Sequence, residues 1–298
     1  MQLKLNNIYQ GDTFELIKSL PTESVDLIVC DGPYGVTAND WDKINNIQEF
    51  NLKLIKIFAR VLKPGGALYL FGKDNCIDFI DYRQHLQLNR KIIWYQPSRL
   101  AQGRKNYTNN YDLICYFSKG KPTIFNLEDI RVPQLVELEH RLRCEKVPSV
   151  VNGQFGKTKF NEDGKNPGDV WGDIKQLTYN SKELINRLML NTIQKPQKLI
   201  ERIVKASSGG GSVVLDPFSG VGTTYAVCKE MNRHFIGFEI NPEYVEITKE
   251  RIKKIEQKQQ EQLFNETENS QRDYQISPIG TGISTENWDT QYLAARFS

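Results

Sequence analysis

The chain has 298 residues, of which 39% are hydrophobic and 25% are charged, a composition typical of a globular protein. It contains no run of about 18 apolar residues, and its first ten residues lack the pattern of a secretory signal, so neither a membrane span nor secretion is expected. The five cysteines are scattered without metal-ligand or redox-motif spacing, which favours reduced thiols in the cytoplasm and predicts no metal site.

The net charge of +3 is unevenly distributed along the chain. Residues 83–165 carry 15 basic and 8 acidic side chains, whereas residues 1–82 carry 8 and 11, and residues 166–298 carry 16 and 17. A basic middle between slightly acidic ends fits a surface that binds a polyanion. An ordinary solvated face rich in lysine and arginine would give the same pattern.

Apolar runs alternate with helical patterns over the first 120 residues. They predict strands at 25–30, 67–72, 91–96 and 111–120 and helices at 47–62 and 79–88, with KPGG at 63–66 ending the first helix. Residues 120–190 contain scattered prolines and glycines and no sustained period, so a loop-rich insertion is expected there.

The alternating pattern returns after residue 195. It predicts helices at 196–207 and 241–264 and strands at 213–218 and 234–240. Strands that alternate with helices indicate an α/β fold with a largely parallel sheet. Residues 265–298 are rich in Ser, Thr, Asn and Gln, and a disordered or loosely docked tail is expected.

The stretch CDGPYG at 30–35 places an acid directly after the first predicted strand. A carboxylate is expensive to bury without a partner, so Asp31 indicates a functional site rather than a simple turn. Gly32 and Pro33 set the path of the backbone, and Tyr34 offers an aromatic face.

The stretch VVLDPFSGVGTT at 213–224 runs from an apolar strand through an acid into a glycine turn and a helix. Gly220 and Gly222 let a ligand approach the backbone at the helix N-terminus, although a bare Gly-x-Gly would also fit a structural turn. No Gly-Lys-Ser/Thr follows to hold phosphates. Glu239, at the end of the next strand, suits the hydroxyls of a ribose, so the set predicts a nucleoside with little phosphate.

Together the two stretches resemble the S-adenosylmethionine-dependent DNA methyltransferases that modify exocyclic amino groups. Their cofactor loop, D-P-F-x-G-x-G-T, is matched by residues 216–223. Their catalytic loop, [DNS]-P-P-[YFW], is matched by Asp31, Pro33 and Tyr34, with Gly32 in place of the first proline. The catalytic loop comes first in the chain, which is the motif order of the β subclass.

The resemblance implies a class I methyltransferase fold, a three-layer, doubly wound, Rossmann-like sheet. It also implies S-adenosylmethionine as the cofactor, with Asp12 near its adenine, Lys195 near its methionine moiety and Glu239 at its ribose. Asn191 and Thr192 depart from the His-Pro that opens the family's segment before the cofactor loop. The cofactor-binding residues implied by the matched motifs are Asp12, Lys195, Asp216, Phe218, Ser219, Gly220, Gly222, Thr223 and Glu239.

The same resemblance implies the chemistry and the domain organisation. The catalytic residues are Asp31 and Gly32, whose carboxylate and carbonyl polarise an amino group, together with Pro33 and Tyr34, which restrain the loop and stack on an extruded base. The partner is double-stranded DNA, and the candidate contacts are Arg99, Arg104, Lys105, Arg141 and Arg143. The domain boundaries are a core of residues 1–120 and 166–264, a target-recognition insertion of 121–165 and a tail of 265–298.

Several alternatives stay open. An Asp-led catalytic loop favours adenine N6 as the target, with cytosine N4 as the alternative. Gly32 also fits a weakened relative that binds DNA without modifying it. A methyltransferase for protein amides would place the cofactor loop before the catalytic loop, which is the reverse of this chain. The recognition sequence, a homodimer and a cognate restriction endonuclease are left undecided by the sequence.

Overall fold

The computed structural model describes most of the chain, namely residues 3–35, 42–97, 105, 107–134, 148–151, 154–157, 161–185 and 194–275. It divides into two compact units, Met1–Ile255 and Glu256–Ser298, and the fold that carries the site belongs to the first.

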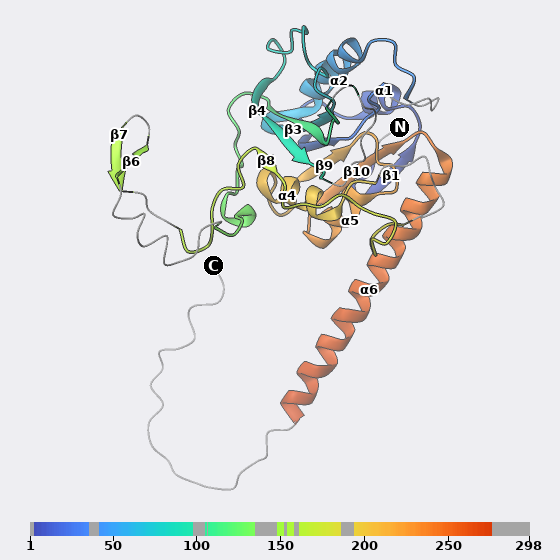
Figure 1. The fold of residues 1–298 in the computed structure, drawn as a ribbon. Coiled ribbons are helices and arrows are strands. Elements are labelled where there is room, and N and C mark those ends of the chain that lie inside the picture. The colour runs from blue at the N-terminus through green and yellow to red at the C-terminus, as the bar shows by residue number, and fades with distance from the viewer. Residues whose placement is uncertain are drawn as a thin grey trace. The chain divides into compact units, whose positions relative to one another are not determined.

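An eight-stranded sheet forms the centre of this first unit (Figure 1). Its spatial order is β1-β10-β9-β2-β3-β5-β4-β8. Every neighbouring pair is parallel except those made by β5, which runs antiparallel to β3 and β4. The strands are β1 (Asn7–Gln10), β2 (Val25–Cys30), β3 (Leu62–Gly72), β4 (Gln87–Tyr95), β5 (Tyr111–Ser118), β8 (Val170–Trp171), β9 (Val213–Asp216) and β10 (His234–Glu239).

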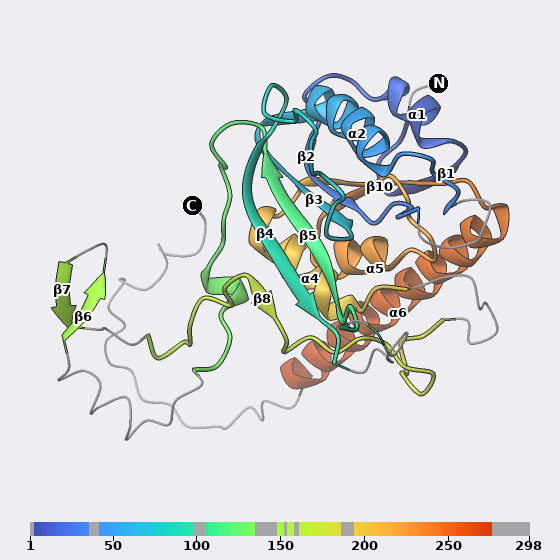
Figure 2. The ribbon, with the colours of Figure 1, turned by 45° about the horizontal axis from the view of Figure 1, so that its top comes forward.

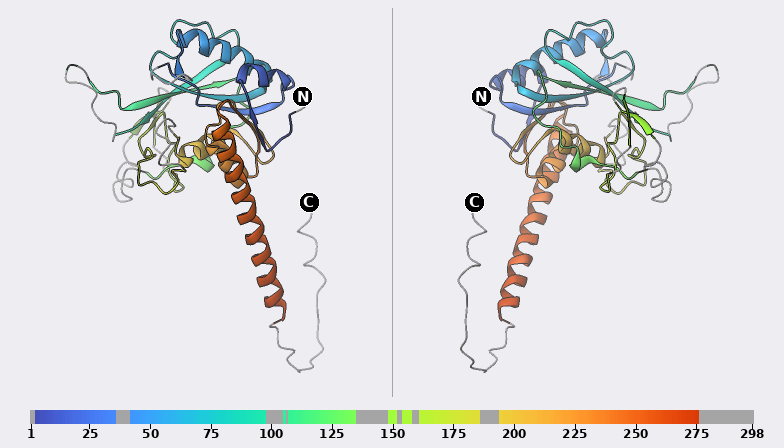
Figure 3. Two further views of the ribbon diagram at one scale, coloured as in Figure 1. Left: turned by 90° about the vertical axis from the view of Figure 1, so that its right-hand side faces the viewer. Right: turned by 90° about the vertical axis from the view of Figure 1, so that its left-hand side faces the viewer.

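Helices cover both faces of the sheet, which confirms the predicted three-layer architecture (Figures 2 and 3). One face carries α1 (Thr13–Leu16) and α2 (Ile47–Val61), and the other carries α4 (Gln197–Ser207) and α5 (Thr223–Glu230). The other helices of the described residues are η1 (Ile17–Ser19), η3 (Glu128–Ile130) and α6 (Pro242–Gln275), and β6 (Pro148–Val151) pairs with β7 (Gln154–Lys157) in a hairpin.

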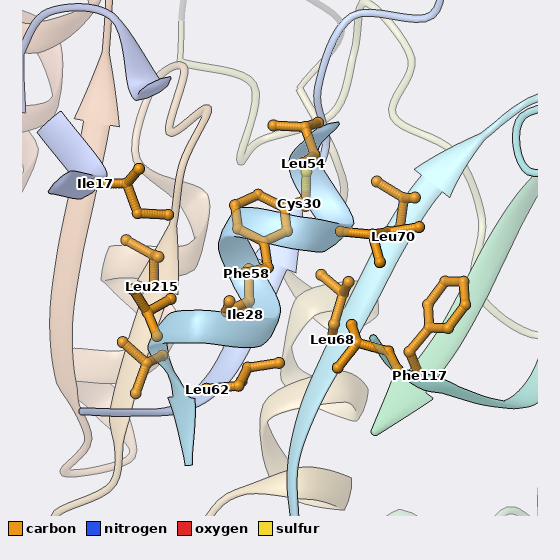
Figure 4. Packing of buried hydrophobic residues seen from close by; sticks show 14 of the residues in the cluster. Ile17, Ile28, Cys30, Leu54, Phe58, Leu62, Leu68, Leu70, Phe117 and Leu215 are labelled. Atoms are coloured by element: carbon orange, nitrogen blue, oxygen red, sulfur yellow. The ribbon is translucent and has the colours of Figure 1, made fainter. Parts of the chain in front are cut away.

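The side chains of the central strands alternate between two hydrophobic cores. On β2, Ile28 and Cys30 point into the core beneath α2, whereas Leu27 and Val29 point into the core beneath α4 and α5. Figure 4 shows the first core, where Phe58 of α2 packs among the aliphatic side chains of the sheet. Each fully buried side chain of this kind contributes about 1.5–3 kcal/mol, so both cores hold the central strands firmly.

Most of the predicted elements are confirmed, and two differ. KPGG does not lie between α2 and the next strand but inside β3, where the β2–β3 register shifts and Gly65 adopts φ +77°. The predicted helix at 79–88 is absent, and turns fill most of residues 74–85. Phe79 has φ +60°, a left-handed conformation that does not continue a right-handed helix.

The second half of the chain shows three further differences. The loop-rich region contains the β6–β7 hairpin and the short strand β8, which joins the main sheet beside β4. Helix α6 continues to Gln275, beyond the predicted end at 264.

The predicted domain boundaries stay a prediction. Within the described residues, no helix is long and apolar enough to cross a membrane.

Candidate active site

The carboxyl ends of four neighbouring parallel strands meet at one edge of the sheet. In the order β1-β10-β9-β2, these ends lead into Asp12, Glu239, Asp216 and Asp31. The pairs Leu27↔Val214 and Ile28↔Leu215 align β2 with β9. Because of this alignment, the two motifs recognised in the sequence, 185 positions apart, lie next to each other.

The Asp31 carboxylate is held by two donors. The Tyr34 hydroxyl donates to Oδ1 over 2.7 Å, and the Lys195 ammonium pairs with Oδ2 over 2.8 Å. Burial and the charge of Asp31 raise the pKa of the Tyr34 phenol well above its ordinary value, so it stays protonated and remains a donor.

The catalytic-loop backbone is held by a residue that the sequence did not single out. The buried Asp42 carboxylate accepts the amide protons of Tyr34 and Gly35, over 2.6 and 2.8 Å, through its Oδ1. Asp42 belongs to no motif, and nothing in its spacing distinguishes it from a surface acid.

Gly32, the departure from the family pattern, lies against the cofactor loop. A Cβ added at this position would be 3.1 Å from the ring of Phe218, which is tighter than an ordinary contact. The glycine therefore lets the aromatic ring of the cofactor loop lie directly against the catalytic loop.

Asp216 is a buried acid with its oxygens engaged. Thr224 Oγ1 donates to one oxygen over 2.5 Å, and the Phe218 amide donates to the other over 3.1 Å. Burial raises its pKa to about 7, and the nearby carboxylates Asp31 and Glu239 add to the rise. Thr224 was not among the predicted residues, although it is the second threonine of the quoted motif.

Glu239 ties the glycine turn to the end of β10. Its carboxylate accepts the Gly220 amide and the Asn241 amide, each over 2.8 Å, and burial raises its pKa. Ser219 is anchored as well, since its amide donates to the Phe238 carbonyl over 2.8 Å. Contacts within the chain therefore fix the shape of the turn.

Two of the predicted cofactor residues have partners that the sequence did not predict. Asp12 caps α1 by accepting the Phe14 amide over 2.8 Å, and its neighbour Thr13 donates a hydrogen bond to the Pro217 carbonyl. Lys195 lies with its ammonium 5.4 Å from the Tyr34 ring centroid and 5.5 Å from that of Phe71. Thr223 begins α5 and is buried.

A second polar cluster, also unpredicted, lies at the same edge beyond Tyr34. Buried Asp112 pairs with Lys73 over 2.7 Å and accepts a hydrogen bond from Gln96 over 3.0 Å. The Lys73 ammonium is 5.6 Å from the Tyr34 ring centroid, so this cluster borders the catalytic loop. Its three residues come from three separate stretches and share no motif.

Of the predicted DNA contacts, Lys105 is exposed. Arg99, Arg104, Arg141 and Arg143 lie outside the described residues.

Solved structures share this fold. The chain aligns with the M1.HpyAVI–SAM complex at a TM-score of 0.54 and 23% identity, covering 82% of this chain and 98% of that one. It aligns with the cytosine-N4-specific PvuII DNA methyltransferase at a TM-score of 0.58 and 17% identity, covering 85% and 92%. The architecture is therefore that of the class I methyltransferases.

Sequence comparison narrows this class to a family. Residues 25–250 match the family model for DNA methylases of the N6/N4 type. Type II methyltransferase M.HpaI of Haemophilus parainfluenzae is 35% identical over 81% of this chain and 72% of its own length. DNA adenine methyltransferase YhdJ of Escherichia coli is 34% identical over 82% of each. The chain belongs to the N6/N4 DNA methylase family, and it is thus a DNA amino-methyltransferase that uses S-adenosylmethionine.

The two glycines of the cofactor turn differ in how much space surrounds them. Gly222 has φ +77°, and an added Cβ would lie 2.5 Å from Thr248 Cγ2, whereas Gly220 has φ +52° and open space. We expect Gly220→Ala to lower the free energy of unfolding by about 1 kcal/mol and Gly222→Ala by about 1–3 kcal/mol more, because overpacking adds to strain. Urea denaturation of the cofactor-free protein measures both. Adding Thr248→Ser should recover part of the Gly222→Ala loss, and no recovery would contradict the contact.

The raised pKa of Asp216 predicts a pH-dependent stability. Between about pH 4 and pH 7 the folded state holds a proton that the unfolded state releases, so this group lowers stability as pH rises. The slope is at most about 1.4 kcal/mol per pH unit. In Asp216→Asn, which keeps a carbonyl acceptor for the Phe218 amide, this slope should disappear. Urea denaturation from pH 4 to 8 compares the two proteins, and equal slopes would contradict the assignment.

Proposed function

We propose that this protein transfers a methyl group to the N6 amino group of adenine in double-stranded DNA, with Asp31 and the Gly32 carbonyl as the catalytic groups. The observation that carries the proposal is the direct contact of the catalytic loop with the cofactor loop, where Gly32 meets the Phe218 ring. A reacting amine bound at Asp31 would lie beside whatever binds on the glycine turn.

The acceptor chemistry supports this role for Asp31. An exocyclic amine is a poor nucleophile because its lone pair is delocalised into the ring, and two hydrogen-bond acceptors draw it toward tetrahedral geometry. A carboxylate offers about four lone-pair sites, of which Tyr34 and Lys195 occupy two. Asp31 can therefore accept one amino hydrogen while keeping both donors, and the Gly32 carbonyl can accept the other. Both acceptors stabilise the positive charge that develops on the nitrogen.

The residues on the glycine turn fit S-adenosylmethionine. Asp31, Asp216 and Glu239 place three carboxylates at one edge, which suits a ligand that carries positive charge. Open space around Gly220 leaves room for a ligand against the backbone. When bound, S-adenosylmethionine supplies an electrophilic methyl group. Its binding site would be formed by Asp216, Phe218, Ser219, Gly220, Gly222 and Thr223. Glu239 serves the ribose and Asp12 the adenine.

DNA would approach along the basic middle of the chain. Extruding the base costs a few kcal/mol, and contacts to phosphates from Arg99, Arg104 and Lys105 would offset it. Tyr34, restrained by Pro33, would stack on the base. Arg141 and Arg143 belong to the insertion 121–165, for which we propose target recognition between the core segments 1–120 and 166–264. The protein would act in the cytoplasm, where the chromosome lies.

Adenine is favoured over cytosine by the Asp-led loop and by the likeness to a relative named as a DNA adenine methyltransferase. Incubating the protein with unmethylated bacterial DNA and labelled S-adenosylmethionine, followed by mass spectrometry of the nucleosides, should yield N6-methyladenine. N4-methylcytosine would overturn the choice of base. Cofactor binding without any product would favour the weakened relative that Gly32 suggests.

Removal of the acceptor should separate chemistry from binding. We expect Asp31→Ala and Asp31→Asn to lower the methyl-transfer rate by about 10²–10³-fold, because the developing charge loses its carboxylate. Affinity for S-adenosylmethionine, measured by calorimetry, should stay within a few-fold. Loss of cofactor binding in a folded Asp31→Asn protein would mean that the loop has another role.

A further inference from the structure

We propose that Lys195 is a positioning residue for methyl transfer, whose ammonium group fixes and charge-balances the Asp31 carboxylate rather than holding the methionine moiety of the cofactor. This inference rests on the proposed function of Asp31. It assigns to Lys195 a partner that the sequence motif does not indicate.

The contacts fix both oxygens of the carboxylate from two separate segments. Tyr34, from the catalytic loop itself, donates to Oδ1, and Lys195, from the segment before α4, pairs with Oδ2 at 2.8 Å. Held at both oxygens, the carboxylate has little freedom to rotate. The two remaining lone-pair sites therefore have a defined direction for an incoming amine.

The burial of Lys195 needs an explanation beyond helix docking. Its side chain is 6% exposed, and a buried ammonium is costly unless it is paired. Helix α4 is attached by other contacts: the Gln197 amide donates to the Glu183 carboxylate over 2.9 Å, and Leu199 and Ile203 are fully buried. The segment would therefore dock without a lysine at position 195.

The charges around Asp31 show why a cation is useful there. Asp216 ends the adjacent strand β9, Glu239 ends β10, and the Cys30 thiol precedes Asp31 on β2. Burial raises the pKa of Cys30 and of Tyr34, so both stay neutral and add no further negative charge.

Lys195 and Lys73 both lie near these groups, and they have different partners. Lys73 lies beside Tyr34 but pairs with Asp112. Within the described part of the chain, the ion pair to Asp31 is made by Lys195. The pair thus offsets the repulsion among acids at this edge and leaves Asp31 available as a charged acceptor.

The chain offers a matched control at the opposite end of the same strand. Lys63 pairs with Asp26 of β2 over 2.8 Å, but its side chain is 42% exposed. Asp26 lies near the start of β2, whereas Asp31 follows the end of that strand. Lys63→Gln removes a lysine–aspartate pair of equal length from the same strand, and it should change the transfer rate less than two-fold.

The test compares Lys195→Gln, Lys195→Arg and Lys63→Gln in single-turnover methyl transfer, with cofactor affinity measured separately by calorimetry. For Lys195→Gln we expect the rate to fall about 10- to 100-fold, the loss typical of a residue that orients a catalytic group, while affinity for S-adenosylmethionine stays within about three-fold. Lys195→Arg keeps the charge but alters the geometry at Asp31, so it should recover at least half of the loss on a logarithmic scale without reaching the wild-type rate. Weakened cofactor affinity with an unchanged saturated rate would overturn the proposal in favour of a methionine-binding role.

Thermal unfolding checks that each variant folds. If Lys195→Gln does not fold, Lys195→Arg alone decides, because altered geometry at Asp31 should slow transfer at unchanged cofactor affinity, and a wild-type rate would refute the inference. The variants of Asp31 distinguish this failure from that of the proposed function. An active Asp31→Asn protein would contradict both the catalytic role of Asp31 and the positioning role of Lys195. An inactive Asp31→Asn protein together with a fully active Lys195→Gln protein would contradict the role of Lys195 alone.

Discussion

The pairing of β2 with β9 is the contact on which the site depends. Two strands from opposite halves of the sequence lie side by side and parallel, so the segments that leave their carboxyl ends meet. Asp26 reinforces this pairing from the other end, since its carboxylate accepts the Val213 amide over 2.8 Å. A shift of either strand by one residue would exchange the faces of its side chains and separate Asp31 from the glycine turn.

Several carboxylates lie at this edge of the sheet, and each is stabilised by different contacts. Asp216 accepts two hydrogen bonds and has a raised pKa, Glu239 accepts hydrogen bonds from backbone amides, and Asp31 forms an ion pair with a lysine. The contacts differ in kind, because burial raises the pKa of Asp216 and of Glu239, whereas Asp31 is paired with the Lys195 ammonium. In the proposed mechanism, Asp216 and Glu239 would bind the cofactor, and Asp31 would contact the reacting amino group.

Local sequence patterns predicted the central strands, the helices around them and the edge at which both motifs lie, because these features follow from apolar periodicity and from the rule for parallel strands. The failures have physical causes. The stretch 79–88 has a helical pattern, yet Phe79 at its start has a left-handed backbone and its last two residues belong to β4. The partner of Lys195 depends on where the start of α4 lies in space, and the contact of Asp42 with the loop spans eight residues without a motif.

The place of β9 in the middle of the sheet has a consequence for synthesis on the ribosome. After β2 and β3 emerge, one edge of β2 stays without its neighbour until residues 213–216 are translated, which takes roughly 7–30 s at ordinary elongation rates. Exposed strand edges invite pairing with other chains. The nascent protein therefore passes through an interval of vulnerability to aggregation, and the candidate site can form only after residues 213–216 have been made.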